Sequence, residues 1–378
     1  MSEEVIRYAN VLVEGRFHAG AVSYDRGVIT SVFVGSSDTL LPSAPYISPG
    51  MIDLQVNGAF GVEVGDDPEA IRLLARRLPE SGVTAFLPTV VTAPAALYER
   101  AFAAFDAARD VDGARPLGLH LEGPLLSPVR KGAHRLELIE AADPSLLDRF
   151  AASDTVRIVT LAPERADILP AIGRLREAGV VVSLGHTDAT IDQFQAGVDA
   201  GAAMATHLFN AMSPFLHRQP GVIGATLIED RITAGLIPDG IHCHLAALQL
   251  AVRAKGWQRI AIVTDMMTAA GMPPGTYGLM GQQVTVSEGS ARLADGTLAG
   301  SIIMMDEAVR NVVRWTEATP AQALSMASEV PARVLGLERT GRLAAGYDAD
   351  LTVFDDQLRV METIIGGQTV YRREGAGT

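Results

Sequence analysis

The sequence has a single cysteine, Cys243, so no disulfide can form within the chain. This excludes a small secreted protein held together by disulfides and fits a reducing compartment. The start of the chain, MSEEVIRYAN, has glutamates where a secretory signal has basic residues, and no apolar segment follows them. No stretch approaches the roughly 18 uninterrupted apolar residues that a membrane-spanning helix needs. We therefore expect a cytoplasmic protein that does not enter a membrane.

Basic residues are also few, with 31 Lys and Arg against 44 Asp and Glu and a net charge of -13. A nucleic-acid-binding protein needs a basic face, so this class of protein is not expected. The only lysines are Lys131 and Lys255, and neither lies on a predicted strand. We therefore do not expect a carbamylated lysine that bridges two metal ions. A phosphorylated metabolite is compatible with this charge, because one arginine or a helix N-terminus supplies a local positive field.

Apolar segments alternate with helical patterns through the middle of the chain. Strand candidates lie near residues 51–56, 84–91, 116–122, 156–162, 180–185, 202–207, 232–237 and 259–264. Such a series of strand–helix units predicts an α/β fold, and a (β/α)8 TIM barrel matches it better than an open doubly wound sheet. No GxGxxG follows any of these strands, which excludes the usual dinucleotide site.

The two ends of the chain are rich in short β patterns separated by Gly and Asp turns. We expect residues 1–48 and 340–378 to form one small β-sandwich domain built from both termini. Residues 49–339 then form the barrel domain, with an inserted hairpin near 275–300.

Four of the predicted strands end in an ionisable side chain: Glu122, His186, His207 and Asp265. Because ligands bind at the C-terminal ends of barrel strands, we expect these side chains to meet. One carboxylate and two imidazoles are a catalytic zinc set, with a fourth position open for water. A single histidine in such a place is more often a hydrogen-bonded core residue, and Asp265 has the alternative role of a helix N-cap. The coincidence of four strand ends favours a site.

The first predicted strand indicates how many metal ions bind. Gln55 and Asn57 stand at positions i and i+2, so they lie on one face of the strand. Imidazoles there would form a second metal site, but amides are poor zinc ligands, which favours one ion over two. His120 shares a strand face with Glu122, and we expect it to support the ligands through hydrogen bonds.

Eight motifs, in chain order, resemble those of the N-acetylglucosamine-6-phosphate deacetylases of the amidohydrolase superfamily: PGMIDLQVNG, HLEGP, RKGAH, GHTDAT, THLFNAM, PDGIHC, TDMMTAAG and LAGS. They run from residue 49 to about residue 305, and the β-rich ends fit the accessory domain of that family. The resemblance implies a (β/α)8 barrel with one divalent metal ion, commonly zinc. It also implies hydrolysis of an acetamide, which yields glucosamine 6-phosphate and acetate in amino-sugar catabolism or cell-wall sugar recycling.

The resemblance assigns a role to each residue that matches a motif. Glu122, His186 and His207 correspond to the metal ligands, and Asp265 corresponds to the acid and base. His134, in RKGAH, resembles the histidine that helps to polarise the substrate carbonyl.

Residues in the other motifs resemble substrate contacts: Asn210 and Ala211 at the sugar phosphate, His242 at the sugar, and Ile303, Met304 and Met305 over the acetyl group. Arg218 resembles an arginine that reaches the phosphate in a neighbouring subunit, which implies a homodimer. The sequence departs from the family pattern at Ile302 and Met266, both close to the expected pocket.

The expected chemistry is consistent with these residue types. A bound metal ion polarises a carbonyl and lowers the pKa of its water, the nucleophile, toward ~7. Asp265 would accept the proton of that water and pass it to the departing nitrogen. Related activities fit the same residues, namely deacetylation of N-acetylgalactosamine 6-phosphate or of an N-acyl amino acid. A barrel that has lost catalysis and serves as a binding protein is a further alternative.

Overall fold

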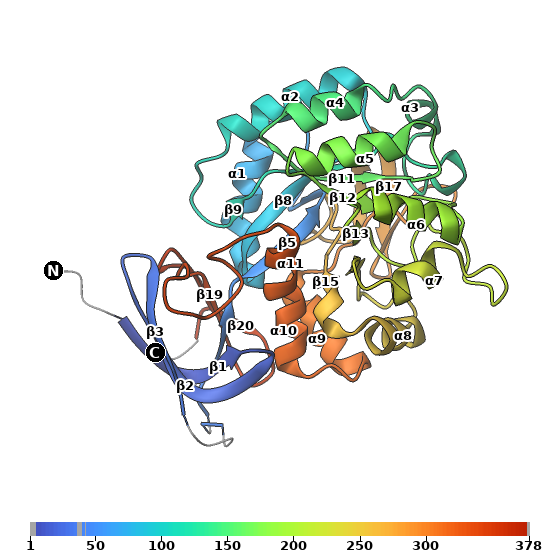
Figure 1. Ribbon diagram of the computed structural model, residues 1–378. Helices are drawn as coiled ribbons and strands as arrows, with labels where there is room; N and C mark the ends of the chain where they lie inside the picture. Colours follow the sequence, from blue (N-terminus) through green and yellow to red (C-terminus); the bar gives the residue numbers. More distant parts are fainter. Residues whose placement is uncertain (1–4, 36–39, 42, 376–378) are drawn as a thin grey trace.

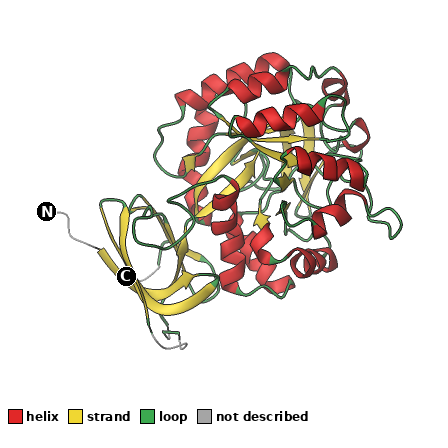
Figure 2. Ribbon diagram, in the orientation of Figure 1, coloured by secondary structure: helices red, strands yellow, loops and turns green. Residues whose placement is uncertain are grey.

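Eight parallel strands form a nearly closed barrel, and helices surround it (Figure 1; Figure 2). This computed structural model describes residues 5–35, 40–41 and 43–375, so the acidic residues at the start of the chain lie outside the described part. The strands pair in the order β15-β14-β13-β12-β11-β10-β8-β5. Their bounds are β5 (Met51–Val56), β8 (Val83–Val91), β10 (Leu119–Glu122), β11 (Val156–Leu161), β12 (Val181–Leu184), β13 (Met204–Ala205), β14 (Thr233–Leu236) and β15 (Ile260–Ile262). The predicted (β/α)8 barrel is confirmed.

The first and last barrel strands meet through the segments that follow them. Asp265 N donates to Gln55 O at 3.0 Å, and Asn57 N donates to Met266 O at 2.9 Å. Every residue of β5 and β8 is buried. Both strands are therefore covered on both faces, and β5 carries two buried polar residues, Asp53 and Gln55, that form hydrogen bonds inside the barrel.

The outer layer consists of helices that follow the strands. Their bounds are α1 (Pro68–Arg77), α2 (Ala95–Ala107), α3 (Leu136–Glu140), α4 (Leu146–Ala152), α5 (Ile168–Glu177), α6 (Ile191–Ala200), α7 (Gly221–Ile228), α8 (Leu245–Lys255), α9 (Met305–Trp315), α10 (Pro320–Ala327) and α11 (Glu329–Val334). A capping box starts α6, in which Thr190 and Gln193 satisfy each other's backbone N–H groups. Among the residues that the structure describes, no helix is both long and apolar enough to traverse a bilayer.

Both ends of the chain build a separate seven-stranded sheet beside the barrel (Figure 1). Its order is β21-β20-β19-β4-β1-β2-β3. The bounds are β1 (Val5–Val13), β2 (Arg16–Asp25), β3 (Val28–Val34), β4 (Tyr46–Pro49), β19 (Leu351–Phe354), β20 (Val360–Ile365) and β21 (Gln368–Arg372). The expected β structure from the two termini is therefore present, and β4 leads directly into the first barrel strand.

A three-stranded antiparallel sheet precedes α9 and consists of β16 (Gly275–Leu279), β17 (Gln282–Ser287) and β18 (Ser290–Arg292). Gln282 Nε2 donates to Ala133 O at 2.8 Å, and Thr268 Oγ1 donates to Gly278 O at 2.9 Å. Because Ala133 and Thr268 follow β10 and β15 respectively, these bonds fix the small sheet near the C-terminal ends of the barrel strands.

Candidate active site

Four side chains predicted to form a site lie at or just beyond the C-terminal ends of barrel strands. Glu122 is the last residue of β10, and His186 and His207 follow the ends of β12 and β13 by two residues. Asp265 follows β15, which ends at Ile262. The closed arrangement of the strands brings these ends together around one opening.

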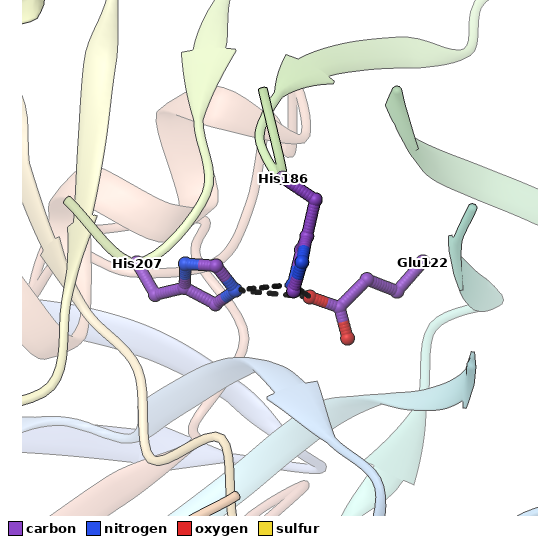
Figure 3. Close-up of side chains that lie close together, drawn as sticks. All are labelled: Glu122, His186 and His207. Atoms are coloured by element: carbon purple, nitrogen blue, oxygen red, sulfur yellow. Dashed lines mark hydrogen bonds and ion pairs between the residues drawn. The ribbon is translucent and has the colours of Figure 1, made fainter. Parts of the chain in front are cut away.

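Three of these residues have a left-handed backbone, with φ of 47° at His186, 28° at His207 and 51° at Asp265. Residues other than glycine rarely adopt this conformation, and each instance costs about 1–3 kcal/mol. Such strain persists only where the surrounding structure compensates for it. Figure 3 shows the result, because both imidazoles turn toward each other and toward Glu122.

The ligand atoms of Glu122, His186 and His207 form a nearly equilateral triangle (Figure 3). Glu122 Oε1 lies 3.2 Å from His186 Nε2 and 3.0 Å from His207 Nε2, and the two Nε2 atoms are 3.1 Å apart. Ligands about 2.0–2.1 Å from one tetrahedral zinc ion lie roughly 3.3 Å from each other. These separations therefore fit three ligands of a single divalent ion, and all three residues are buried.

The protonation of two of these residues, His186 and Glu122, also suits a cation. His186 Nδ1 donates to Arg130 O at 2.9 Å, which leaves the lone pair of Nε2 facing the centre of the site. His207 Nδ1 is buried and has no hydrogen-bond partner within the described part of the chain. Burial alone would raise the pKa of Glu122, but hydrogen bonds to His186 and His207 lower this pKa well below its usual value. The deprotonated carboxylate is the form that binds a metal ion.

Asp265 is positioned by two side-chain amides from the first barrel strand and the residue after it. Asn57 Nδ2 donates to Asp265 Oδ1 at 2.7 Å, and Gln55 Nε2 donates to the same oxygen at 2.9 Å. Because both donors bind Oδ1, the other oxygen, Oδ2, is the one left to exchange protons. Burial and the nearby charge of Glu122 raise the pKa of Asp265 to about 6. A carboxylate in this range is an effective general base near neutral pH.

A second buried carboxylate, Asp53, holds the backbone beside Asp265. Thr264 Oγ1 donates to Asp53 Oδ2 at 2.6 Å, and Thr264 N donates to Asp53 Oδ1 at 3.3 Å. From the other side, Ser301 N donates to Asp265 O at 2.8 Å and Ser301 Oγ donates to Thr264 O at 2.5 Å. Burial raises the pKa of Asp53 to about 7. These bonds stabilise the left-handed conformation at Asp265.

His134 lies beside Glu122, with its Nε2 atom 3.7 Å from Glu122 Oε2. Its Nδ1 atom lies 2.8 Å from Thr92 Oγ1 and accepts a hydrogen bond from Thr92 N at 3.4 Å. A backbone N–H can only donate, so the ring proton is on Nε2, the atom on the Glu122 side of the ring. Burial and the nearby His186 lower the pKa of His134 to about 3, so this imidazole is a neutral hydrogen-bond donor.

A cavity of about 320 Å³ joins these residues to solvent. Residues that follow β13 and β14 line one part of it, namely Asn210, Ala211 and His242. His242 Nδ1 lies 2.6 Å from Asp239 Oδ2, which fixes the orientation of the ring. Apolar side chains from five places line the rest of the cavity: the end of β8, the segment after β10, the end of β16, the β16–β17 turn and the segment after β18. They are Val91, Val129, Ala133, Leu279, Met280 and Leu298.

Four of the expected substrate contacts do not line this cavity. Arg218 is exposed in the loop that precedes α7. Ile303 and Met305 are buried in the main hydrophobic core, and Met304 is half-buried at the start of α9. These roles stay predictions.

The structure also shows the surroundings of three other residues singled out from the sequence, namely His120, Met266 and Ile302. His120 Nδ1 lies 2.9 Å from Leu54 O and its Nε2 lies 2.8 Å from Thr160 Oγ1, so it bonds within the barrel rather than to a metal ligand. Met266 is fully buried, and its backbone helps to close the barrel. Ile302 is half-buried against the small three-stranded sheet.

Sequence reasoning missed Thr92, Arg130 and Asp239. Thr92 is a polar residue directly after β8, the same signal that identified the ligands, and it could have been found in that way. Asp239 stands three residues before His242, a spacing that suits a local hydrogen bond. Arg130 holds His186 through its carbonyl oxygen, and a backbone contact leaves no signal in the residue type.

Comparisons with known proteins agree with this arrangement. The sequence matches the amidohydrolase family over residues 46–370. It is 40% identical to the N-acetylglucosamine-6-phosphate deacetylase of Lysinibacillus sphaericus, over 88% of this chain and 87% of that protein. It is 42% identical to the N-acetylgalactosamine-6-phosphate deacetylase of Escherichia coli O157:H7, over 86% of this chain and 88% of that protein.

A solved structure also resembles the whole chain. It is a variant of N-acetyl-D-glucosamine-6-phosphate deacetylase from Mycobacterium smegmatis in complex with N-acetyl-D-glucosamine-6-phosphate. The two structures agree with a TM-score of 0.88 at 34% sequence identity, over 97% of this chain and 99% of that chain.

Proposed function

The chain belongs to the amidohydrolase family, and we propose that it hydrolyses the acetamide of N-acetylglucosamine 6-phosphate to glucosamine 6-phosphate and acetate. The observation that carries this proposal is the meeting of Glu122, His186 and His207 with Asp265 in one cavity. Relatives that match most of the chain at about 40% identity have this activity by name, and the similar Mycobacterium smegmatis structure holds this substrate.

Glu122, His186 and His207 would hold one divalent ion per subunit, and we propose zinc. The ligand set of one carboxylate and two imidazoles supports zinc, and the amides at Gln55 and Asn57 do not favour a second ion. A bound ion polarises the substrate carbonyl and lowers the pKa of water toward ~7.

The proton transfers are assigned to Asp265 and His134. Asp265 accepts the proton of the attacking water at Oδ2, since Oδ1 already accepts two hydrogen bonds from amides. The same carboxyl group then donates this proton to the amide nitrogen as the C–N bond breaks, which releases the amine. The neutral His134 donates a hydrogen bond from Nε2 to the carbonyl oxygen, where negative charge develops.

The sugar and its phosphate would bind on the other part of the cavity, at Asn210, Ala211 and His242. Arg218 is exposed and does not line the cavity of its own chain. This position supports the proposal that it reaches the phosphate in a neighbouring subunit of a homodimer. The single cysteine and the phosphorylated substrate support a cytoplasmic location.

A second substrate is supported by one specific observation, the 42% identity to an N-acetylgalactosamine-6-phosphate deacetylase. The two sugars differ only in the configuration at C4. Asn210, Ala211 and His242 offer hydrogen-bonding groups that either epimer could use, so kinetics with each epimer decide between them.

The test is acetate release by the purified protein from N-acetylglucosamine 6-phosphate and its C4 epimer, before and after chelation. We expect acetate and free amine in equal amounts, loss of activity after chelation, and recovery with zinc. A metal-loaded protein that cleaves neither sugar but releases acetate from an N-acetyl amino acid would overturn the assigned substrate. A protein with neither metal nor acetate release would be a binding protein instead.

A further inference from the structure

The order of the barrel strands determines where the acyl group lies in the proposed reaction. The proposed sugar contacts follow β13 and β14, and Asp265 follows β15. With the sugar on this side and the substrate carbonyl beside Glu122, the acyl chain would extend toward β8. This direction differs from the one that the resemblance implies, in which residues 303–305 lie over the acetyl group. Val91, the last residue of β8, is the register partner of Glu122 and lines the active-site cavity.

A second cavity of about 360 Å³ lies on the other side of Val91. Val91 and Met280 line both cavities, so these two side chains separate them. One side of the second cavity is apolar and consists of residues in or next to β8, α2 and α3: Val90, Ala93, Pro94, Leu97 and Leu138. The charged residues Glu63, Asp66, Asp67 and Arg135 line the rest of it. The apolar side suits a hydrocarbon chain.

Met280 occupies a position that methionine rarely takes. It forms the two-residue turn between β16 and β17 with Gly281, and both residues have positive φ, 55° and 70°. A turn with two left-handed residues prefers Asn, Asp or Gly at its first position. The backbone is nevertheless fixed, because Met280 N donates to Glu63 Oε1 at 2.7 Å. A strained residue that persists in a fixed turn at a ligand cavity suggests that its side chain has a function.

We propose that Met280 determines the length of the acyl chain that this enzyme hydrolyses. This inference rests on the proposed deacetylase function. The side chain of Met280 closes the acyl end of the active-site cavity, where an acetyl methyl group fits. It also blocks longer chains from the second cavity. When the side chain is shortened, the two spaces join, and a propanoyl or butanoyl chain extends past Val91 into the second cavity. The reaction is unchanged, since water still cleaves the amide to a carboxylate and an amine.

The test compares kcat/KM for N-acetyl-, N-propanoyl- and N-butanoyl-glucosamine 6-phosphate in the wild type and in Met280→Ala. The wild type should prefer the acetyl substrate strongly, because one methylene group in a fitted site changes kcat/KM by ~10- to 200-fold. Met280→Ala should raise the butanoyl-to-acetyl ratio by at least about tenfold. Met280→Gly suits the turn better and should show the same change if the alanine variant folds poorly. Met272→Ala is the matched control, since Met272 is exposed and lines neither cavity.

Two results would overturn the proposal. One is a wild type that cleaves the butanoyl substrate as well as the acetyl substrate. The other is an unchanged ratio in folded Met280→Ala and Met280→Gly proteins that still cleave the acetyl substrate. A wild type that cleaves none of the three substrates contradicts the proposed function instead, so the two failures are distinguishable.

Discussion

Asn57 and Asp265 are 208 residues apart in the sequence, but Asn57 Nδ2 lies 2.7 Å from Asp265 Oδ1. This hydrogen bond crosses the junction between the first and last barrel strands. The hydrogen bond that positions the proposed general base therefore also links the two strands that close the barrel. Several expectations about catalysis follow from the bonds around this junction.

Replacement of Asp265 by Asn should leave the metal content and the fold intact while kcat falls by about 10²- to 10⁴-fold. The amide keeps the shape of the side chain but cannot accept the proton of water. Steady-state kinetics, elemental analysis and circular dichroism test the three parts of this expectation. Near-normal turnover would refute the assigned base.

Activity should decrease below about pH 6. The pKa of Asp265 is raised from 3.8 to about 6, so the basic form is lost as the pH falls through this value. The hydrogen bond from Asn57 lowers this pKa, so Asn57→Ala should shift the acid limb of the kcat/KM profile to higher pH. Gln195→Ala, which removes an exposed amide on α6, should leave the profile in place. An unmoved limb in Asn57→Ala would mean that another group controls it.

Loss of either imidazole ligand should remove the metal ion. His186→Ala and His207→Ala each leave two ligands, too few for a stable site. We expect less than stoichiometric metal by elemental analysis of protein purified without added zinc. His244→Ala is the control, since His244 is exposed and caps α8. Full metal content in both ligand variants would contradict the assigned centre.

Arg218→Ala should raise KM for the 6-phosphate substrate by roughly 10- to 100-fold, because a hydrogen bond to a charged group contributes about 1.5–3 kcal/mol. KM for unphosphorylated N-acetylglucosamine should change little. Arg253→Ala, which removes an exposed arginine paired with Glu317, serves as control. An equal rise for both sugars would place the phosphate elsewhere.

Asp53→Asn should lower kcat with little effect on KM or metal content, since it weakens the bonds that hold the backbone at Asp265. It should also change how stability depends on pH. Asp53 has a folded-state pKa of about 7, raised above its usual 3.8. Its contribution to stability is therefore complete below pH 3.8 and is lost as the pH rises through 7.

Thermal unfolding across this pH range tests the second part of the expectation. The decline in Tm between pH 4 and 8 should be smaller in Asp53→Asn than in the wild type. Identical pH dependence in the two proteins would show that Asp53 does not titrate in this range. An unchanged kcat would show that Ser301 and the amides alone hold Asp265.

The barrel fold and the proximity of Glu122, His186 and His207 were predictable because each depends on local patterns. Glu122, His186 and His207 stand at or just after the ends of apolar strands, and a closed parallel barrel arranges such ends around one opening. Met305 shows the limit of this reasoning. The resemblance implies a wall over the acetyl group there, which stays a prediction. The structure places the residue on the buried face of α9, and the rotation of a helix start depends on packing that a motif does not specify.

Other parts of the site could not be predicted, since they depend on tertiary contacts without a residue signature. The carbonyl of Arg130 selects the tautomer of His186, yet any residue at that position offers the same oxygen. Met280 reaches the cavity only because Glu63 and the small sheet fix the turn over the barrel. Contacts between residues that are distant in the sequence, such as these, can be identified only from the folded structure.

The left-handed residues of the site set a limit on how robust this enzyme can become. His186, His207 and Asp265 each hold strain of about 1–3 kcal/mol, against a typical net folding free energy of about 5–15 kcal/mol. Selection for heat tolerance would find some of its largest available gains at these positions, where glycine removes the strain. The same changes would delete two proposed metal ligands and the proposed base, so adaptation to high temperature must come from elsewhere in the molecule.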